Sequence, residues 1–229
     1  MKRIVQSELL DTLPPNDPRA VHSRQDLRRV NGWMRNHVIM ADELLEALNQ
    51  QPLQQITELG AGDGDFLFRV AQRLSPFWPN VMATMIDWQK NVTGETLVAF
   101  AALGWRAEAV VTNVFQWPKA STPSGPVIAN LFLHHFENPP LAALLNLISQ
   151  RVDLFIALEP RRSCWPEFCS RLLWVVGCND VTRHDALVSV RAGFSGQELS
   201  RLWPNNQNWR LTEQRAGAFS HLFIAQKIS

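Results

Sequence analysis

The sequence contains no tyrosine, although it contains 9 tryptophans and 12 phenylalanines. A tyrosine hydroxyl is one of the groups that transfer a proton in active sites. Its absence excludes every mechanism that depends on a catalytic tyrosine.

The chain also lacks an excess of charge of either sign. It has 22 lysines and arginines against 21 aspartates and glutamates, which gives a formal net charge of +1. Proteins that bind nucleic acid usually carry a strong basic excess. A mildly basic N-terminal stretch, with Arg24, Arg28, Arg29 and Arg35, is more typical of a solvated helix face. We therefore expect no nucleic-acid partner.

Long apolar runs and paired cysteines are missing as well. No apolar run is long enough to span a membrane, and Met1 to Glu8 lack the apolar core of a signal peptide. Cys164, Cys169 and Cys178 have spacings that fit neither a zinc motif nor a C-x-x-C pair. We expect a cytoplasmic protein with buried free thiols, no membrane partner and no metal site.

The pattern along the 229 residues divides the chain into two parts. Residues 1–50 predict an N-terminal helical cap, with Ser23 capping a helix over Arg24–Met34 and a second helix over Ala41–Asn49. Residues 51–229 alternate between strand and helix patterns, which is typical of a doubly wound α/β domain. The expected strands are Gln55–Leu59, Val81–Ile86, Ala109–Thr112, Val127–Leu133, Leu154–Leu158, Trp209–Gln214 and His221–Lys227, and the expected helices include Phe66–Leu74, Gln89–Ala102, Pro139–Gln150 and Trp165–Val176.

The earlier strands are apolar on both faces, which indicates a parallel sheet covered by helices. The last two strands read as a closing hairpin, so we expect a seven-stranded, mostly parallel sheet whose last strand is antiparallel. The polar string Asn179–Phe194 lies between expected helices. It belongs to an insertion around residues 160–200 that we expect on the substrate side.

A glycine-rich turn follows the first expected strand, in the sequence Glu58-Leu59-Gly60-Ala61-Gly62-Asp63-Gly64. Such a turn lets backbone N–H groups and a helix N-terminus approach a nucleotide-like ligand, because no Cβ stands in the way. The spacing differs from the G-x-G-x-x-G pattern that seats a diphosphate. The acid ahead of the turn suits a ligand that carries positive charge.

Polar residues follow the other strands at the same edge of the expected sheet. Asp87 follows the second strand, where its carboxylate could accept hydrogen bonds from two ribose hydroxyls. Asn113 follows the third strand, where its amide could read an adenine edge. The fourth strand runs into the segment from Asn130 to Phe136, which includes His134 and His135.

These residues resemble the motifs of the class I S-adenosylmethionine-dependent methyltransferases, and the resemblance extends from about Gln50 to the C-terminus. It implies S-adenosylmethionine as the cofactor. The implied cofactor-binding residues are Glu58, Gly60, Ala61, Gly62 and Gly64 for the methionine and ribose, Asp87 for the ribose, Trp88, Asn113 and Val114 for the adenine, and Asn130. Asn113 departs from the family's frequent aspartate. The alternative is a Rossmann-like domain that binds another nucleotide.

Three histidines are candidate general bases, namely His134, His135 and His184. Adjacent side chains on an extended segment point in opposite directions, so we expect only one of His134 and His135 to face the substrate, with a slight preference for His134. His184 is a candidate because Asp185 could orient its ring. Arg183, Asp185 and Arg191 are candidate substrate-binding residues, and a structural salt-bridge network is an equal alternative for them.

The resulting hypothesis is methyl transfer to a small molecule, most simply to oxygen on a phenolic or polyketide-like acceptor. Candidate walls for such an acceptor are Trp33, Phe136, Trp165 and Phe194. Two alternatives remain: a methyltransferase acting on RNA or protein, and a non-catalytic partner that binds the cofactor and regulates another enzyme. The sequence leaves open the acceptor, the choice among oxygen, nitrogen and carbon, and whether the chain forms a homodimer.

Overall fold

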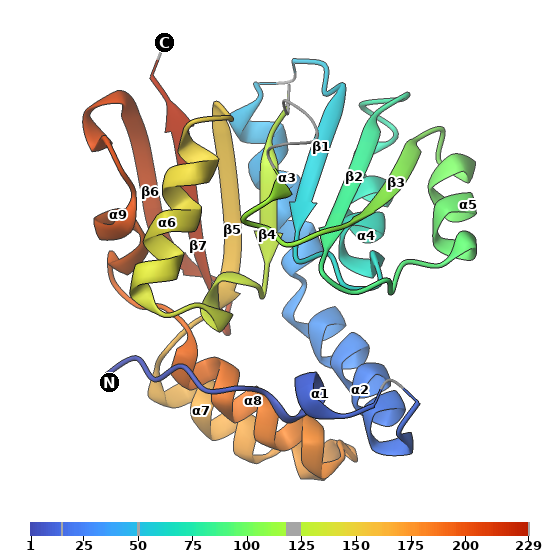
Figure 1. Ribbon diagram of the computed structural model, residues 1–229, viewed down its shortest axis with the longest axis vertical. Helices are drawn as coiled ribbons and strands as arrows, with labels where there is room; N and C mark the ends of the chain where they lie inside the picture. The colour runs from blue at the N-terminus through green and yellow to red at the C-terminus, as the bar shows by residue number, and fades with distance from the viewer. Residues whose placement is uncertain (15, 50, 118–124, 229) are drawn as a thin grey trace.

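The computed structural model describes residues 1–14, 16–49, 51–117 and 125–228. Their centre is a twisted sheet of seven strands in the order β3-β2-β1-β4-β5-β7-β6 (Figure 1). The strands are β1 Gln55–Leu59, β2 Met82–Asp87, β3 Arg106–Val111, β4 Val127–Asn130, β5 Leu154–Pro160, β6 Trp209–Ala216 and β7 Ser220–Lys227.

Strands β1 to β5 pair in parallel, and β7 pairs antiparallel with both β5 and β6. The antiparallel step follows from the short connection between β6 and β7, because a hairpin reverses the chain whereas a parallel crossover needs many more residues. The predicted fold class is therefore confirmed, with the antiparallel last strand between β5 and β6.

Helices cover both faces of the sheet, and the strand residues alternate between two apolar cores. One core joins β1, β4 and β5 to α3 Asn36–Ala47, α4 Asp65–Leu74 and α5 Gly94–Ala102. The other joins the opposite strand faces to α6 Asn138–Ser149 and α9 Glu198–Leu202. On β5, for example, Ile156 packs in the first core and Phe155 in the second. All seven residues of β5 are buried, which explains why its sequence is an almost unbroken apolar run.

A separate layer of helices lies beyond the carboxyl ends of the parallel strands (Figure 1). It consists of α1 Leu9–Thr12, α2 Pro18–Met34, α7 Cys164–Arg171 and α8 Asp180–Ala192. Arg35, with φ of 55°, adopts the left-handed conformation between α2 and α3, so the chain changes direction there. The division at residues 50 and 51 stays a prediction. The helices of this layer do not coincide with residues 1–50, because α3 packs on the sheet, and α7 and α8 come from the insertion.

Several expected boundaries are wrong for local reasons. Helix α2 begins at Pro18, capped by the side chain of Asp17, so Ser23 lies inside the helix rather than at its start. The polar string Asn179–Phe194 is largely helical, because the Asn179 side chain accepts a hydrogen bond from the Thr182 N–H and starts α8. Helix α5 begins at Gly94, where Thr93 caps it, rather than at Gln89.

Two other elements are shorter than expected. Strand β4 ends at Asn130 and not at Leu133, because Leu131 has φ of 52° and the chain then forms the 3-10 helix η2 Leu133–His135. The helix expected over Trp165–Val176 divides into α7 and the 3-10 helix η3 Leu173–Val176. None of the helices in the described residues is both long and apolar enough to cross a membrane.

Asp26 joins the two parts of the helical layer. Its carboxylate is fully buried and accepts hydrogen bonds from the Asn179 N–H at 2.8 Å and the Thr182 hydroxyl at 3.2 Å, at the start of α8. Arg29, one turn further along α2, pairs with the same carboxylate. Burial alone would disfavour the charged form, but these hydrogen bonds outweigh it and lower the pKa of Asp26 below its ordinary 3.8.

We predict that Asp26→Ala lowers the free energy of unfolding by about 2–4 kcal/mol, because it leaves buried donors and an arginine without their acceptor. Denaturant unfolding measures this loss. The matched control is Asp42→Ala, which removes an exposed pair with Arg73 at 3.4 Å and should change stability by less than about 1 kcal/mol.

The contribution of Asp26 also has a defined pH dependence. Because its folded pKa is lowered, the stabilisation is complete above the unfolded pKa of about 3.9 and is lost as the pH falls through the folded pKa. The difference between wild type and Asp26→Ala should therefore shrink in acid, and a difference that stays constant to the acid limit contradicts this account.

Candidate functional site

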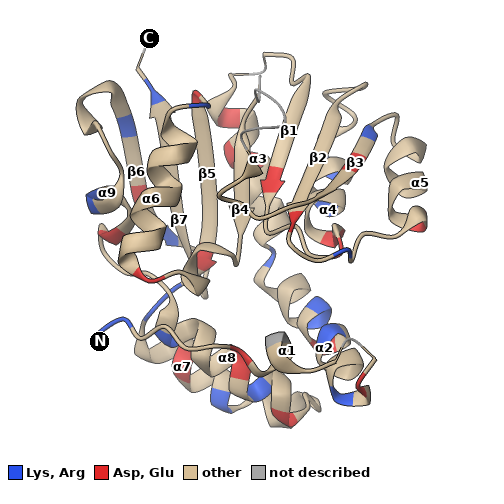
Figure 2. Cartoon of the chain, viewed as in Figure 1, with Lys and Arg blue, Asp and Glu red and all other residues tan. Residues whose placement is uncertain are grey.

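A cavity of about 1020 Å³ lies between the carboxyl ends of the strands and the helical layer. The sheet contributes Glu58, Asp87 and Asn130 to its wall, and the helical layer contributes Trp33 and Ser189. Figure 2 shows acidic segments at the carboxyl ends of β1 and β5 and basic segments along α2. The cavity occupies the position at which α/β sheets bind their ligands.

The glycine turn forms the floor of this cavity. Gly60, Gly62 and Gly64 all have positive φ, at 71°, 56° and 80°. The N–H groups of Gly60 and Ala61 both donate to the Ile86 carbonyl, and the Gly62 N–H donates to the Asp87 carboxylate at 2.9 Å. The ends of β1 and β2 are thereby tied together, with the turn wrapped tightly around them.

The three glycines differ in what a side chain would meet. A Cβ at Gly60 would stand 2.1 Å from the Phe132 ring, and one at Gly64 would stand 2.6 Å from the Met85 sulfur. A Cβ at Gly62 meets nothing within 4 Å. Packing against the Phe132 ring therefore disfavours a side chain at Gly60, whereas at Gly64 the close atom belongs to a flexible methionine and at Gly62 the backbone is open to a ligand.

Glu58 is the buried acid beside this turn. It is 1% exposed, and its Oε2 has no hydrogen-bond partner among the described residues. Burial, and then the charges of Asp63 and Asp87, raise the pKa of Glu58 well above its ordinary value. An unpartnered buried carboxyl oxygen is costly. A bound ammonium or sulfonium cation would remove that cost, so the residues present fit a cationic ligand.

The other predicted cofactor residues also line the cavity. Asp87 accepts backbone N–H groups from Gly62 and Gln89, so its carboxylate is held in place. Trp88 is 67% exposed at the cavity edge, and Asn113 bends the backbone there by accepting the Phe115 N–H. The Asn130 side chain accepts a hydrogen bond from buried Asn36 at 2.8 Å. Gly60, Ala61, Gly62 and Val114 line it too, whereas Gly64 packs beneath the turn.

At the other end of the cavity, Glu159 organises η2. Its carboxylate accepts the backbone N–H groups of Phe132, Leu133 and His134, and it lies 2.9 Å from Nδ1 of His134. The His134 ring is buried, with Glu8 on its other side at 3.5 Å from Nε2. Burial opposes the charged ring, but these two carboxylates outweigh it and raise the pKa of His134 to about 9.

Glu8 and His135 complete this end of the cavity. Glu8 accepts a hydrogen bond from Ser189, and although its burial favours the neutral acid, the interactions with His134 lower its pKa to about 2. The His135 ring lies 4.3 Å from the His134 ring. Desolvation, and then the charge of His134, lower the pKa of His135 to about 4.

The expectation that His134 and His135 point in opposite directions is wrong. It assumed an extended segment, whereas the two residues lie in a 3-10 helix and both line the cavity. The cause is Glu159, because its carboxylate takes the N–H groups at the start of η2 and stabilises a helical turn there.

The predicted substrate residues lie outside the cavity wall in the described structure. Asp185 is buried and accepts the N–H groups of Leu9 and Leu10, Arg191 pairs with Glu167 at 3.0 Å, and Arg183 is exposed. His184 is 49% exposed and lies 3.0 Å from Asp185. The pairing of His184 with Asp185 is as expected, but the contacts of this group tie helices together. A substrate-binding role for these residues stays a prediction.

Glu8 and Glu159 were not among the predicted site residues. Glu159 could have been found, because it ends a buried strand as Asp87 does. Glu8 carries no local pattern. It reaches the cavity because the N-terminal segment is strapped down by Arg3, which donates to the carbonyls of Ala192 and Phe136 and lies 4.4 Å from the Phe194 ring.

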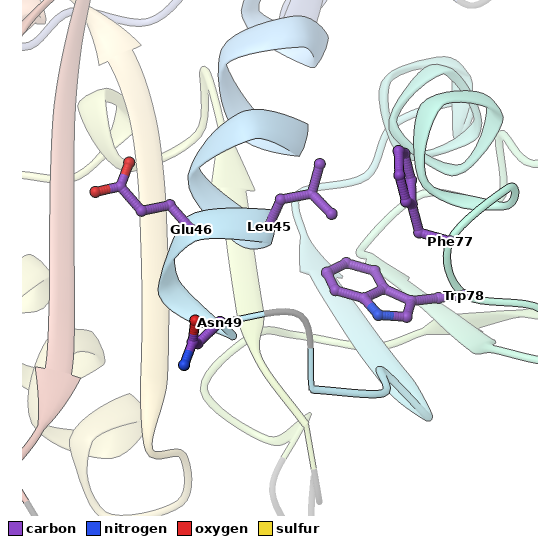
Figure 3. A pocket seen from close by; sticks show the side chains of 5 residues that line it. All are labelled: Leu45, Glu46, Asn49, Phe77 and Trp78. Atoms are coloured by element: carbon purple, nitrogen blue, oxygen red, sulfur yellow. The ribbon is translucent and has the colours of Figure 1, made fainter.

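A second hollow of about 520 Å³ lies beside the C-terminal end of α3 (Figure 3). Its walls are the side chains of Leu45, Glu46, Asn49, Phe77 and Trp78. It is smaller than the main cavity and has one ionisable group in its wall. The main cavity is therefore the candidate site.

No protein-family model and no curated protein matches the chain. Solved structures match it over most of its length. The plantazolicin methyltransferase BpumL in complex with SAH has a TM-score of 0.64 and 12% identity, over 93% of this chain and 92% of its own. The magnesium protoporphyrin IX methyltransferase ChlM from Synechocystis PCC 6803 with bound SAH has a TM-score of 0.58 and 16% identity, over 89% and 86%.

An O-methyltransferase family protein from Burkholderia thailandensis matches with a TM-score of 0.59 and 16% identity, over 94% of this chain and 64% of its own. Together these matches show that the chain has the fold of the class I S-adenosylmethionine-dependent methyltransferases. The resemblance inferred from the motifs is thereby confirmed at the level of the fold.

We predict that Gly60→Ala and Gly62→Ala separate the packing role of the turn from its ligand-binding role. Both substitutions place a side chain at positive φ, with a similar backbone cost of about 1–2 kcal/mol. Only Gly60→Ala adds a clash with Phe132, so it should be less stable than Gly62→Ala by a further ~1–3 kcal/mol. Thermal and denaturant unfolding test this order, and equal stabilities contradict it.

Proposed function

We propose that this protein binds S-adenosylmethionine and transfers its methyl group to an oxygen atom of a small phenolic or polyketide-like acceptor. The observation that carries the proposal is the buried carboxyl of Glu58, whose Oε2 is without a partner in the described residues, beside a glycine turn open at Gly62. A diphosphate would be repelled there, whereas a ligand with an ammonium group gains a charge-assisted hydrogen bond.

Different residues of the chain bind different parts of the cofactor. Glu58 holds the cationic methionine end, the open backbone at Gly62 lets the ligand approach, and Asp87, already fixed by two N–H donors, binds the ribose hydroxyls. Trp88 and Asn113 flank the adenine at the cavity edge. When bound, S-adenosylmethionine supplies a methyl group that is already activated by a sulfonium. The protein therefore has to provide mainly alignment and exclusion of water.

The acceptor takes the end of the cavity below η2. Of the four aromatic residues that we expected as acceptor walls, Trp33 and Phe136 line the cavity, whereas Trp165 and Phe194 are not part of its wall. The helical layer closes over it and limits the acceptor to a small molecule. His135 faces the acceptor and is the residue of the pair that we assign to the removal of its proton, with His134 held by Glu159 and Glu8 beside it.

The matched structures support methyl transfer in general, because BpumL and ChlM are methyltransferases crystallised with SAH. Their low identities leave the acceptor open. The near-balanced charge of the chain favours a small molecule over RNA, and the polar groups at the acceptor end favour an enzyme over a regulatory partner.

The first test concerns Glu58. Burial raises the pKa of Glu58, so this carboxyl holds a proton more tightly in the free protein than an exposed glutamate does, and a cationic ligand favours loss of that proton. We predict that binding of S-adenosylmethionine releases a proton and tightens as the pH rises. Calorimetry in buffers of different ionisation enthalpy measures the release.

Glu58→Gln is the matched variant. It keeps the shape of the protonated side chain, so the fold should persist, but the affinity should fall by about 10–100-fold and the proton release should disappear, since a charge-assisted hydrogen bond contributes about 1.5–3 kcal/mol. Unchanged affinity in Glu58→Gln would remove the observation on which the cofactor assignment rests.

The second test concerns the acceptor end. We predict that His135→Ala lowers kcat by about 10²–10⁴-fold, the usual contribution of a general base, while the affinity for S-adenosylmethionine changes little. Formation of S-adenosylhomocysteine with a panel of phenolic acceptors gives the rate. His184→Ala tests the other predicted base, and His22→Ala, at an exposed position, is the control. A His135→Ala enzyme of normal kcat contradicts this assignment.

A further inference from the structure

Glu8, His134 and His135 form a cluster at the acceptor end of the cavity. Each offers one ligand atom, and these atoms all lie within 4.8 Å of one another. Glu8 comes from the N-terminal segment and the two histidines from η2, so the cluster joins parts of the chain that are far apart in sequence. All three side chains line the cavity.

His134 is oriented as a metal ligand before any metal arrives. Its Nδ1 lies 2.9 Å from the Glu159 carboxylate, which fixes the plane of the ring and directs Nε2 toward Glu8. Metal-binding histidines almost always use the second ring nitrogen for a hydrogen bond of this kind. Glu159 itself is fully buried and held by three backbone N–H groups, so this orientation is rigid.

The nitrogen that faces the cluster lacks a hydrogen-bond partner. Nε2 of His134 is buried and faces Oε1 of Glu8 at 3.5 Å as an ion pair, without a hydrogen bond of normal geometry among the described residues. A polar atom left in this state costs free energy. A ligand between His134 and Glu8 would remove this cost. A metal ion that binds here has to displace the proton of this ring nitrogen. The state of this nitrogen is an observation separate from the clustering of the three residues.

The spacing fits one small cation. Ligand distances of about 2.0–2.2 Å place neighbouring ligand atoms of a tetrahedral ion about 3.3 Å apart. The distance from Nε2 of His134 to Oε1 of Glu8 is 3.5 Å. The His135 ligand atom lies within 4.8 Å of the other two, and because its side chain is exposed, its ring is free to adjust toward a bound ion.

The donor set identifies the class of ion. Mg²⁺ and Ca²⁺ are bound almost entirely through oxygen, so two imidazoles disfavour them. Two histidines and one glutamate are instead a donor set of catalytic Zn²⁺ sites, which leave a fourth position open. Here the open position faces the cavity.

We propose that Glu8, His134 and His135 bind one divalent transition-metal ion of the Zn²⁺ class. The expectation of no metal site rested on the spacing of the cysteines and does not concern these residues. The ion would hold an oxygen of the acceptor at its open position. In the metal-bound protein His135 would serve as a ligand, and the role of base that we assign to it above applies to the metal-free protein. The role of the ion toward the acceptor rests on the proposed function, whereas metal binding itself does not.

The experiment is calorimetric titration of Zn²⁺ into the chelator-treated full chain, repeated with Co²⁺ while the visible absorption of the ion is followed. We expect one ion per chain and the absorption of tetrahedral Co²⁺. Glu8→Gln and His135→Ala should each weaken binding by at least about 100-fold, since even outer-shell partners of a metal contribute 10–100-fold. His22→Ala, an exposed histidine outside the cavity, should bind as wild type does.

Binding of S-adenosylmethionine is measured on the same samples, and circular dichroism establishes that each variant is folded. Absence of stoichiometric Zn²⁺ binding, or equal affinity in wild type, Glu8→Gln and His135→Ala, overturns the metal site. If S-adenosylmethionine still binds in that case, the proposed function survives. If Zn²⁺ binds and S-adenosylmethionine does not, the proposed function fails and the metal site stands.

Discussion

The carboxylate of Glu159 is the contact on which the acceptor half of the molecule depends. It lies next to the last residue of β5 and is fully buried, and its carboxylate accepts three successive backbone N–H groups and faces the ring of His134. These bonds convert the end of β4 into η2 and turn His134 toward Glu8. Glu8 belongs to the N-terminal segment, so Glu159, a single buried acid, determines the shape of the cavity end and orients the ring that Glu8 faces.

The buried glutamates at the two ends of the cavity have pKa values shifted in opposite directions. At the cofactor end, Glu58 has acidic neighbours and an unpartnered oxygen, and its pKa is raised. At the acceptor end, Glu8 is matched by an imidazole, and its pKa is lowered to about 2. The first arrangement leaves a carboxyl oxygen for a cationic ligand, and the second places two carboxylates on either side of the His134 ring. A single cavity can therefore receive two chemically different molecules side by side.

The cofactor half of the site was predictable because its residues follow buried strands directly. Glu58, the glycine turn and Asp87 are local patterns, and the parallel sheet brings their positions to one edge. The acceptor half was not predictable in the same way. The helical conformation at His134 depends on Glu159, which comes from another strand, and the position of Glu8 depends on the contacts of Arg3. Helix α8 carries polar residues such as Asp185 that bond to other segments, so its sequence does not show a clear apolar stripe.

The helical layer has a consequence for the order in which the molecule can be completed. Its α2 is docked through Asp26 onto the start of α8, and the N-terminal Arg3 bonds to the end of the same helix. Contacts between segments so distant in the chain form late, because the loop between them must close first. The sheet and the glycine turn need neither segment, so the cofactor-binding side of the cavity can form before the helical layer covers it.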